Sequence, residues 1–295
     1  MNGFGRYHPI VTFSYFTAVL LFSMFFMHPV CLVISLISGF CYSVMLNGRR
    51  AVRFQLLYLL PLMLISALLN PAFNHEGATV LTYLPSGNPL TLESLAFGLG
   101  AAVMIGAVIS WFSCYHAVMT SDKFVYLFGR MMPAMSLILS MVLRFVPKFR
   151  TQIHKVAEAQ RGIGRDISCG SMFARARHGL TILSVMVTWA LENAIETADS
   201  MRSRGYGLPG RTAFSIFIFD RRDRNAFLVI AGLGIYVLIG AVLGGNAFRY
   251  FPTMKGAGVS VYHISIFVAY GILCLIPAAI ECWEAWRWKA IESRI

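Results

Sequence analysis

Residues 94–117 read SLAFGLGAAVMIGAVISWFSCYHA and contain no Asp, Glu, Lys or Arg. A helix that crosses the hydrocarbon core of a bilayer needs about 20 mostly apolar residues, so this stretch predicts a membrane-spanning helix. The composition of the whole chain agrees, since 57% of its 295 residues are hydrophobic and 13% are charged, with a mean hydropathy of +0.67. Soluble domains average roughly 45–50% apolar and 25% charged residues, so that class is excluded.

Further apolar segments of similar length predict an all-α, polytopic membrane protein with about six transmembrane helices. The segments are residues 10–27, 29–46, 54–70, 94–117, 226–245 and 260–281. His28-Pro29 supplies the turn between the first two, because proline disfavours helix in the residue before it and suits a first helical turn. Turn residues around the β-prone run 78–84 predict a small hairpin after the third segment.

The positions of Lys and Arg predict the orientation, because these residues are retained on the cytoplasmic side of spanning helices. Arg49, Arg50 and Arg53 follow the second segment, whereas residues 71–93 contain neither Lys nor Arg. We therefore expect residues 71–93 to lie outside, and residues 119–224 and both chain termini to lie in the cytoplasm. The expected location is the plasma membrane.

The chain is thus expected to divide into residues 1–118 with four transmembrane helices, residues 119–224 as a helical cytoplasmic coupling domain, and residues 225–295 with two transmembrane helices and a cytoplasmic tail. Arg249 and Lys255 are exceptions to the charge rule, since they would lie outside. The net charge of +12 suits an inner domain. Nucleic acid is not an expected partner, because the basic residues alternate with acids and lack an aromatic stacking platform.

Two long helices are predicted in the coupling domain, ending near residues 162 and 204. In the second, Ala190, Ala194 and Ala198 recur every four residues. Small residues at this spacing let two helix backbones approach closely, which predicts a helix-crossing seam. Alanine is also simply a good helix former, and the pattern does not separate the two interpretations.

The two helices end in a shared Arg-Gly-x-Gly pattern. The two copies are Arg161-Gly162-Ile163-Gly164 and Arg204-Gly205-Tyr206-Gly207. Glycine just beyond the last helical turn takes the left-handed cap conformation, and arginine in that turn suits the negative end of the helix dipole. One interpretation is therefore capping alone. The other is that the two ends present two arginines to a partner.

Several stretches resemble the transmembrane T component of energy-coupling factor (ECF) transporters, and the similarity is expected over nearly the whole chain. They are the apolar start with its His-Pro turns, Leu143-Arg144-Phe145-Val146-Pro147, Ala159-Gln160-Arg161-Gly162, and the block from Ala198 to Gly207. In that family, Ala-Arg-Gly-type motifs at the ends of two crossing coupling helices insert into grooves of two ATP-hydrolysing subunits. The matching motifs here are Gln160-Arg161-Gly162 and Ser203-Arg204-Gly205, in which Arg and Gly match and the first residue departs from Ala.

The resemblance implies a coupling scaffold, not an enzyme. Such a scaffold transmits ATP-driven motion from two ABC-type ATPase subunits to a substrate-binding membrane S component, for uptake of a vitamin or a metal. It implies no cofactor in this chain, because the partner subunits bind ATP. The residues agree: the sequence has no G-x-x-x-x-G-K-[ST] loop, no metal-ligand spacing, and few ionisable residues within its spans. The alternative is a membrane-embedded enzyme or channel whose basic inner domain binds lipid or nucleotide.

Overall fold

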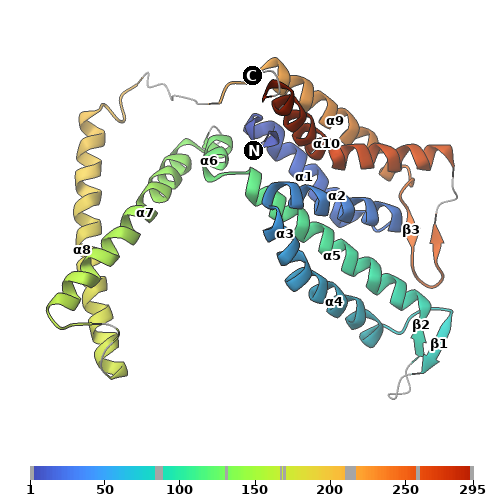
Figure 1. Cartoon of the computed structure of the whole chain (residues 1–295), viewed down its shortest axis with the longest axis horizontal. Helices are drawn as coiled ribbons and strands as arrows, with labels where there is room; N and C mark the ends of the chain where they lie inside the picture. Colours follow the sequence, from blue (N-terminus) through green and yellow to red (C-terminus); the bar gives the residue numbers. More distant parts are fainter. Residues whose placement is uncertain are drawn as a thin grey trace. The chain divides into compact units, whose positions relative to one another are not determined.

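The computed structural model describes residues 3–83, 89–129, 132–166, 168, 171–209, 217–256 and 260–292. The chain folds into two compact units (Figure 1). Unit 1 consists of Met1–Lys123 and Phe217–Ile295, and unit 2 consists of Phe124–Ile216. The two segments expected to hold the transmembrane helices therefore pack together in one unit.

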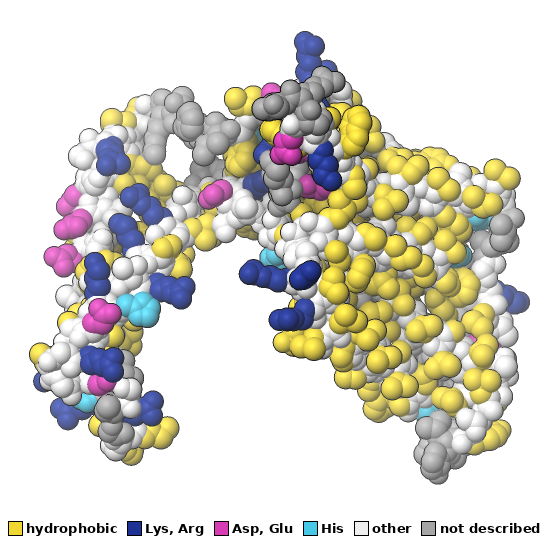
Figure 2. Space-filling view, in the orientation of Figure 1, with side chains coloured by type: hydrophobic (Ala, Val, Ile, Leu, Met, Phe, Trp, Pro, Cys, Tyr) yellow, Lys and Arg dark blue, Asp and Glu magenta, His cyan; other side chains and the backbone are white. Residues whose placement is uncertain are grey.

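Unit 1 is a bundle of apolar helices. They are α1 (Pro9–Phe25), α2 (Pro29–Asn47), α3 (Arg49–Phe54), which continues through a π-helical turn (Gln55–Leu59) into α4 (Leu60–Phe73), and then α5 (Leu92–Val118), α9 (Arg221–Val242) and α10 (Val261–Glu292). Helix α5 packs against α1, α2 and α4, and α10 packs against α2 and α9. Figure 2 shows hydrophobic side chains over most of the visible surface of this unit, as expected where lipid replaces water.

Five helices among the described residues are long and apolar enough to cross a membrane: Pro29–Asn47, Arg49–Phe73, Leu92–Val118, Arg221–Val242 and Val261–Glu292. The first predicted span forms the apolar helix Pro9–Phe25, whose 17 residues make it shorter than these. The third and last spans extend beyond their predicted limits, because helical hydrogen bonding continues into polar flanks that a hydropathy pattern excludes. The protein is an all-α, polytopic membrane protein.

Two membrane helices begin at a His-Pro pair. At α1, His8 is the N-cap and its Nδ1 accepts a hydrogen bond from the backbone N–H of Ile10, at 3.2 Å. At α2, Nδ1 of His28 accepts from the N–H of Val30, at 3.3 Å. The following proline suits the first helical position because its missing N–H is not needed there. The predicted turn at His28-Pro29 is confirmed.

Small hairpins lie at one end of unit 1. β1 (Val80–Tyr83) pairs antiparallel with β2 (Pro89–Thr91), which confirms the predicted hairpin, and β3 (Phe248–Arg249) pairs with β4 (Lys255–Gly256). The N–H of Ala78 donates to the carbonyl of Pro252, at 3.1 Å, and so joins the two loops. The carboxylate of Glu93 accepts from the hydroxyl and the N–H of Thr79, at 2.9 and 3.2 Å.

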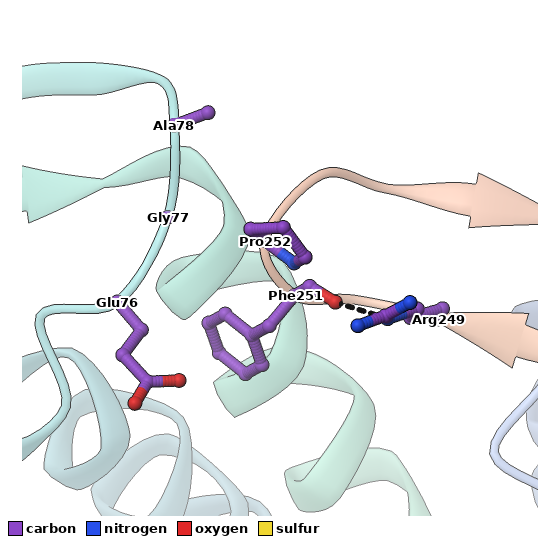
Figure 3. A pocket seen from close by; sticks show the side chains of 6 residues that line it. All are labelled: Glu76, Gly77, Ala78, Arg249, Phe251 and Pro252. Carbon is purple, nitrogen blue, oxygen red and sulfur yellow. Dashed lines mark hydrogen bonds between the residues drawn. The ribbon is translucent and has the colours of Figure 1, made fainter.

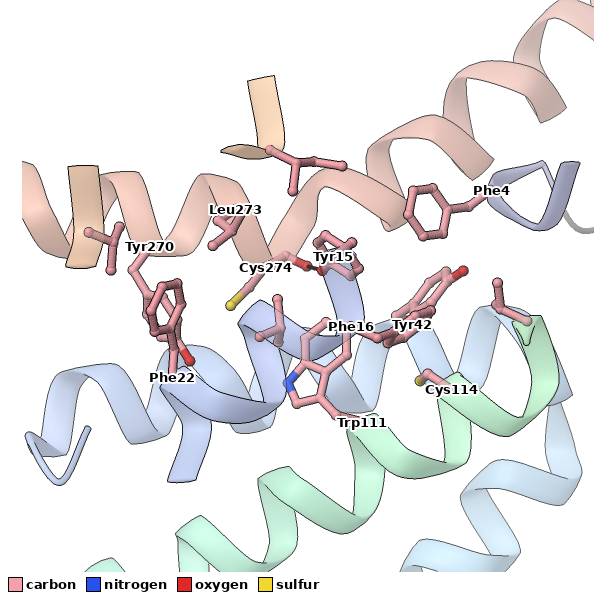
Figure 4. Close-up of a cluster of buried hydrophobic side chains, with 14 of the residues drawn as sticks. Phe4, Tyr15, Phe16, Phe22, Tyr42, Trp111, Cys114, Tyr270, Leu273 and Cys274 are labelled. Carbon is pink, nitrogen blue, oxygen red and sulfur yellow. Dashed lines mark hydrogen bonds between the residues drawn. The ribbon is translucent and has the colours of Figure 1, made fainter. Parts of the chain in front are cut away.

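Aromatic side chains fill the core of unit 1 (Figure 4). Tyr15, Trp111 and Tyr270 are fully buried. Their polar atoms are paired, as a site without water requires: the indole N–H of Trp111 donates to Ser35 at 3.0 Å, and the hydroxyl of Tyr15 donates to the carbonyl of Cys274 at 3.1 Å. These contacts hold α1, α2, α5 and α10 together.

The N-terminal segment fixes both places where the chain leaves and re-enters unit 1. The amide of Phe4, in the short 3-10 helix Phe4–Arg6, donates to Glu281 of α10 at 3.2 Å. The buried ammonium of Lys123, in α6 (Ser121–Gly129), donates to the carbonyl of Gly5. On the returning chain, Asp223 of α9 accepts from the backbone N–H of His8 at 3.1 Å.

Unit 2 contains the end of α6 and two long helices, α7 (Pro133–Gly162) and α8 (Met172–Ser203). They pack against each other, with Trp189 of α8 edge-on to Phe149 of α7 at 5.3 Å between ring centroids. Helix α8 begins earlier than residue 179, where its apolar pattern starts, because the hydroxyl of Ser171 caps the N–H of Ala174 at 3.4 Å.

Candidate coupling site

The candidate site lies at the C-terminal ends of α7 and α8. Figure 1 shows the two ends at different places within unit 2, with most of the length of α8 between them. A 32-residue helix such as α8 is about 48 Å long, at 1.5 Å per residue. The predicted triplets 160–162 and 203–205 therefore form two separate sites.

Helix α7 ends in a Schellman motif centred on Gly164. This glycine has φ +77°, in the left-handed region that side chains rarely adopt. Its N–H donates to the carbonyl of Arg161 at 3.0 Å, and the N–H of Arg165 donates to the carbonyl of Gln160 at 2.9 Å. These two bonds satisfy carbonyls that the end of a helix leaves without an intrahelical partner.

Helix α8 ends in the same motif, centred on Gly205, which has φ +75°. The N–H of Gly205 donates to the carbonyl of Arg202, and the N–H of Tyr206 donates to the carbonyl of Met201, both at 3.0 Å. Both Arg-Gly-x-Gly segments therefore do form helix caps, as the capping interpretation predicts.

The two copies of the sequence pattern are nevertheless out of register in the structure. When the two ends are aligned on the left-handed glycine, Arg204 corresponds to Ile163, and Arg161 corresponds to Arg202. The sequence predicts that the glycine directly after each arginine adopts the left-handed conformation. This prediction is confirmed for Gly205 but is wrong for Gly162, which is the last residue of α7. The end of α7 thus presents an aliphatic side chain, 64% exposed, where the end of α8 presents a guanidinium.

The two arginines also differ in their partners. Nε of Arg161 lies 3.0 Å from a carboxylate oxygen of Asp166, while its side chain stays 72% exposed. Hydrogen bonds from Ser168, and then the guanidinium of Arg161, lower the pKa of Asp166, so this carboxyl is ionised at neutral pH. Arg204 is exposed and makes no ion pair within the described part of the chain. Sequence reasoning overlooked both Ile163 and Asp166, although each lies within five residues of Arg161.

The proposed seam of Ala190, Ala194 and Ala198 lies on an open face of α8. Ala194 and Ala198 are exposed and Ala190 is half-buried. The buried side chains of α8 are instead Ile182 and Met186. A helix crossing at the alanines therefore stays a prediction.

Groups elsewhere do not assemble a catalytic site in the described residues. A hollow of about 360 Å³ between the two hairpin loops is lined by Glu76, Gly77, Ala78, Arg249, Phe251 and Pro252 (Figure 3). In this hollow, Nε of Arg249 donates a hydrogen bond to the carbonyl of Phe251, at 2.7 Å. No three His, Cys, Asp or Glu side chains lie together as a metal site would need, among the residues that the structure describes.

The fold and the site define a multi-pass α-helical membrane protein that carries a separate unit of two long helices with capped, exposed ends. No family model matches the chain. Among curated proteins, it is similar to the energy-coupling factor transporter transmembrane protein EcfT of several bacteria. The identity is 34% over 102 residues with the protein from Lactobacillus helveticus, 34% over 103 with that from Lacticaseibacillus paracasei, and 34% over 105 with EcfT 1 of Listeria monocytogenes.

These similarities cover 33 to 34% of this chain and 37 to 40% of the relatives' own length. The resemblance to the ECF transmembrane component is therefore confirmed for about a third of the chain. The motifs suggested a similarity over nearly the whole chain, and the matched stretches are shorter than that.

Proposed function

We propose that this protein is the transmembrane coupling subunit of an ECF-type ABC importer. It transmits motion from two cytoplasmic ATPases to a substrate-binding membrane subunit and hydrolyses no ATP itself. The cargo is a vitamin or a metal ion chosen by that other subunit. The protein lies in the cell membrane with both termini in the cytoplasm. The observation that carries the proposal is the pair of capped, exposed helix ends in a chain similar to EcfT proteins.

The architecture of unit 2 suits two docking sites. Each Schellman cap fixes the backbone of its helix end, so the side chains there project from a rigid support. The triplets Gln160-Arg161-Gly162 and Ser203-Arg204-Gly205 are the proposed contacts. Because the two triplets lie at separate helix ends, one ATPase subunit can bind at each.

Arginine suits this role on chemical grounds. A guanidinium presents five donors in a planar fork and can bridge to carboxylate or carbonyl acceptors in a groove of the partner. Arg204 is free to do so among the described residues, and the exposed fraction of Arg161 leaves donors beyond the one facing Asp166. The contacts at Arg204 should therefore be the stronger of the two.

Purification of the tagged chain in a mild detergent tests the proposal. Mass spectrometry of the bound chains should identify ABC-type ATPases and a further small membrane protein, and the complex should hydrolyse ATP. The chain alone should not. Purification without any ATPase, together with ion conduction or catalysis by the isolated chain, would contradict the proposal and favour a membrane-embedded enzyme or channel.

A further inference from the structure

A second cavity lies in unit 1 where α2 gives way to α3. It has a volume of about 490 Å³ and is lined by Asn47, Phe54, Ile109, Phe112, Ser113, His116 and Ala117. Its walls are divided by polarity. Ile109 and Phe112 lie nearer the middle of α5, whereas Ser113 and His116 lie nearer its C-terminal end. Asn47, the last residue of α2, lines the same cavity. The cavity is therefore amphipathic along its length.

Three arginines of α3 lie in the chain between the lining residues Asn47 and Phe54. Arg49, Arg50 and Arg53 are exposed on α3 and form no ion pair with any described residue. Arg50 precedes the lining residue Phe54 by four positions, so both lie on the same face of the helix. Figure 2 shows cationic side chains at the border of the hydrophobic surface of unit 1, in the region where Figure 1 draws α3.

The helix start adds to the positive character of this border. Gly48 turns the chain with φ +56°, and the 25-residue helix Arg49–Phe73 begins directly after it. The first N–H groups of a helix lack intrahelical acceptors and carry a partial positive charge. A ligand at this place would meet three guanidinium groups and these N–H groups at one end, and aromatic and aliphatic side chains at the other.

We propose that this cavity binds one anionic phospholipid molecule. The phosphate lies among Arg49, Arg50 and Arg53, and an acyl chain runs along Phe54, Ile109 and Phe112. Three unpaired positive charges favour a headgroup with net negative charge over a zwitterionic one, and the apolar wall favours a lipid over a free phosphate ion. Each cation near such a surface strengthens binding about fivefold, so two arginines together contribute roughly 25-fold.

Native mass spectrometry of the full chain in detergent, titrated with phosphatidylglycerol or phosphatidylcholine, tests the proposal. The wild type should retain one phosphatidylglycerol at least about tenfold more tightly than phosphatidylcholine. The double variant Arg50→Gln/Arg53→Gln should lose this preference, and Arg50→Lys/Arg53→Lys should keep most of it. Arg249→Gln, which removes an exposed arginine beside the other hollow, is the matched control and should bind as the wild type does.

Two further experiments distinguish binding of a lipid from binding of a phosphate ion. Phe112→Ala should weaken retention of phosphatidylglycerol, because it removes apolar wall without changing charge, and millimolar inorganic phosphate should not displace the lipid. Equal binding of both lipids, or unchanged binding by the double glutamine variant, would overturn the proposal. Displacement by inorganic phosphate with no effect of Phe112→Ala would also overturn it, since the site would then be one for a phosphate ion.

Discussion

Arg204 and Arg161 occupy different positions in otherwise identical caps. Arg204 precedes the left-handed Gly205 directly, whereas Arg161 lies three residues before Gly164 and faces Asp166. Within the described residues, a partner that binds Arg204 would break no ion pair, whereas one that uses all the donors of Arg161 would compete with Asp166. The two helix ends are thus unequal in chemistry although their backbones match.

We predict that Arg204→Ala lowers both transport and recovery of the ATPases by about tenfold or more, since hydrogen bonds to charged groups contribute roughly 1.5–3 kcal/mol. Arg204→Lys should recover only part of the loss, because an ammonium group cannot replace the planar fork. Arg161→Ala should have a smaller effect, and the double alanine variant a larger one. Uptake by whole cells and quantitative copurification measure these effects.

The control for this series is Arg177→Ala, an exposed arginine near the start of α8. It should transport normally, and all variants should reach the membrane in equal amounts. Wild-type transport and wild-type ATPase recovery by the double variant would show that neither arginine couples.

At the level of the helices, the histidine N-caps of α1 and α2 make the stability of the fold depend on whether the imidazole is protonated. Burial lowers the pKa of His8, while the nearby Asp223 raises it less. The cap needs a neutral Nδ1, because this atom accepts the N–H of Ile10. The folded state therefore binds a proton less readily than the unfolded state, so the cap stabilises fully above pH 6.5 and is lost as pH falls through the folded-state pKa.

We predict that the unfolding temperature of the purified protein falls more steeply between pH 7.5 and pH 5 than that of His8→Asn. Asparagine is a good N-cap that does not titrate, so this variant keeps the hydrogen bond at both pH values. Thermal unfolding in detergent, followed by tryptophan fluorescence, measures the difference. Parallel pH profiles for the two proteins would exclude His8 as the titrating group.

The open alanine face of α8 leads to a prediction for the assembled transporter. Because Ala194 is exposed in this chain, Ala194→Leu should leave the unfolding of the isolated protein unchanged. If another helix packs on this face, the added side chain overpacks the crossing and should lower transport about tenfold while ATP hydrolysis continues. Glu196→Gln, two residues further along, should be mild. Normal transport by Ala194→Leu would mean that the alanines are only helix formers.

Hydropathy and turn chemistry were sufficient to predict most helices, because apolar runs near 20 residues and His-Pro turns depend on local sequence. The register of the helix caps was not predictable in the same way. Gly162 and Gly164 can both adopt a left-handed conformation, and the choice between them depends on where the helical hydrogen bonds stop. The ion pair of Arg161 with Asp166 and the open alanine face likewise depend on the folded backbone.

For the whole molecule, orientation in the membrane is the property on which the docking sites depend. The cation-free stretch 71–93 is expected outside and residues 119–224 inside. In a variant without native cysteines, a thiol at Thr82 in β1 should react with an impermeant reagent added to intact cells. A thiol at Ser171 should react only after the membrane is opened. The reverse pattern would place the helix ends of unit 2 outside, where ATPases cannot reach them.

Site-specific photo-crosslinking tests the central claim most directly. A photo-reactive amino acid is placed at Ile163 or Tyr206, at the two capped helix ends, and at Leu64 on the exposed face of α4 as a control. In cells that produce the complete transporter, the account predicts adducts with ABC-type ATPases from positions 163 and 206 and none from position 64. Absence of an ATPase adduct from both helix ends, in protein that is inserted normally, would contradict it.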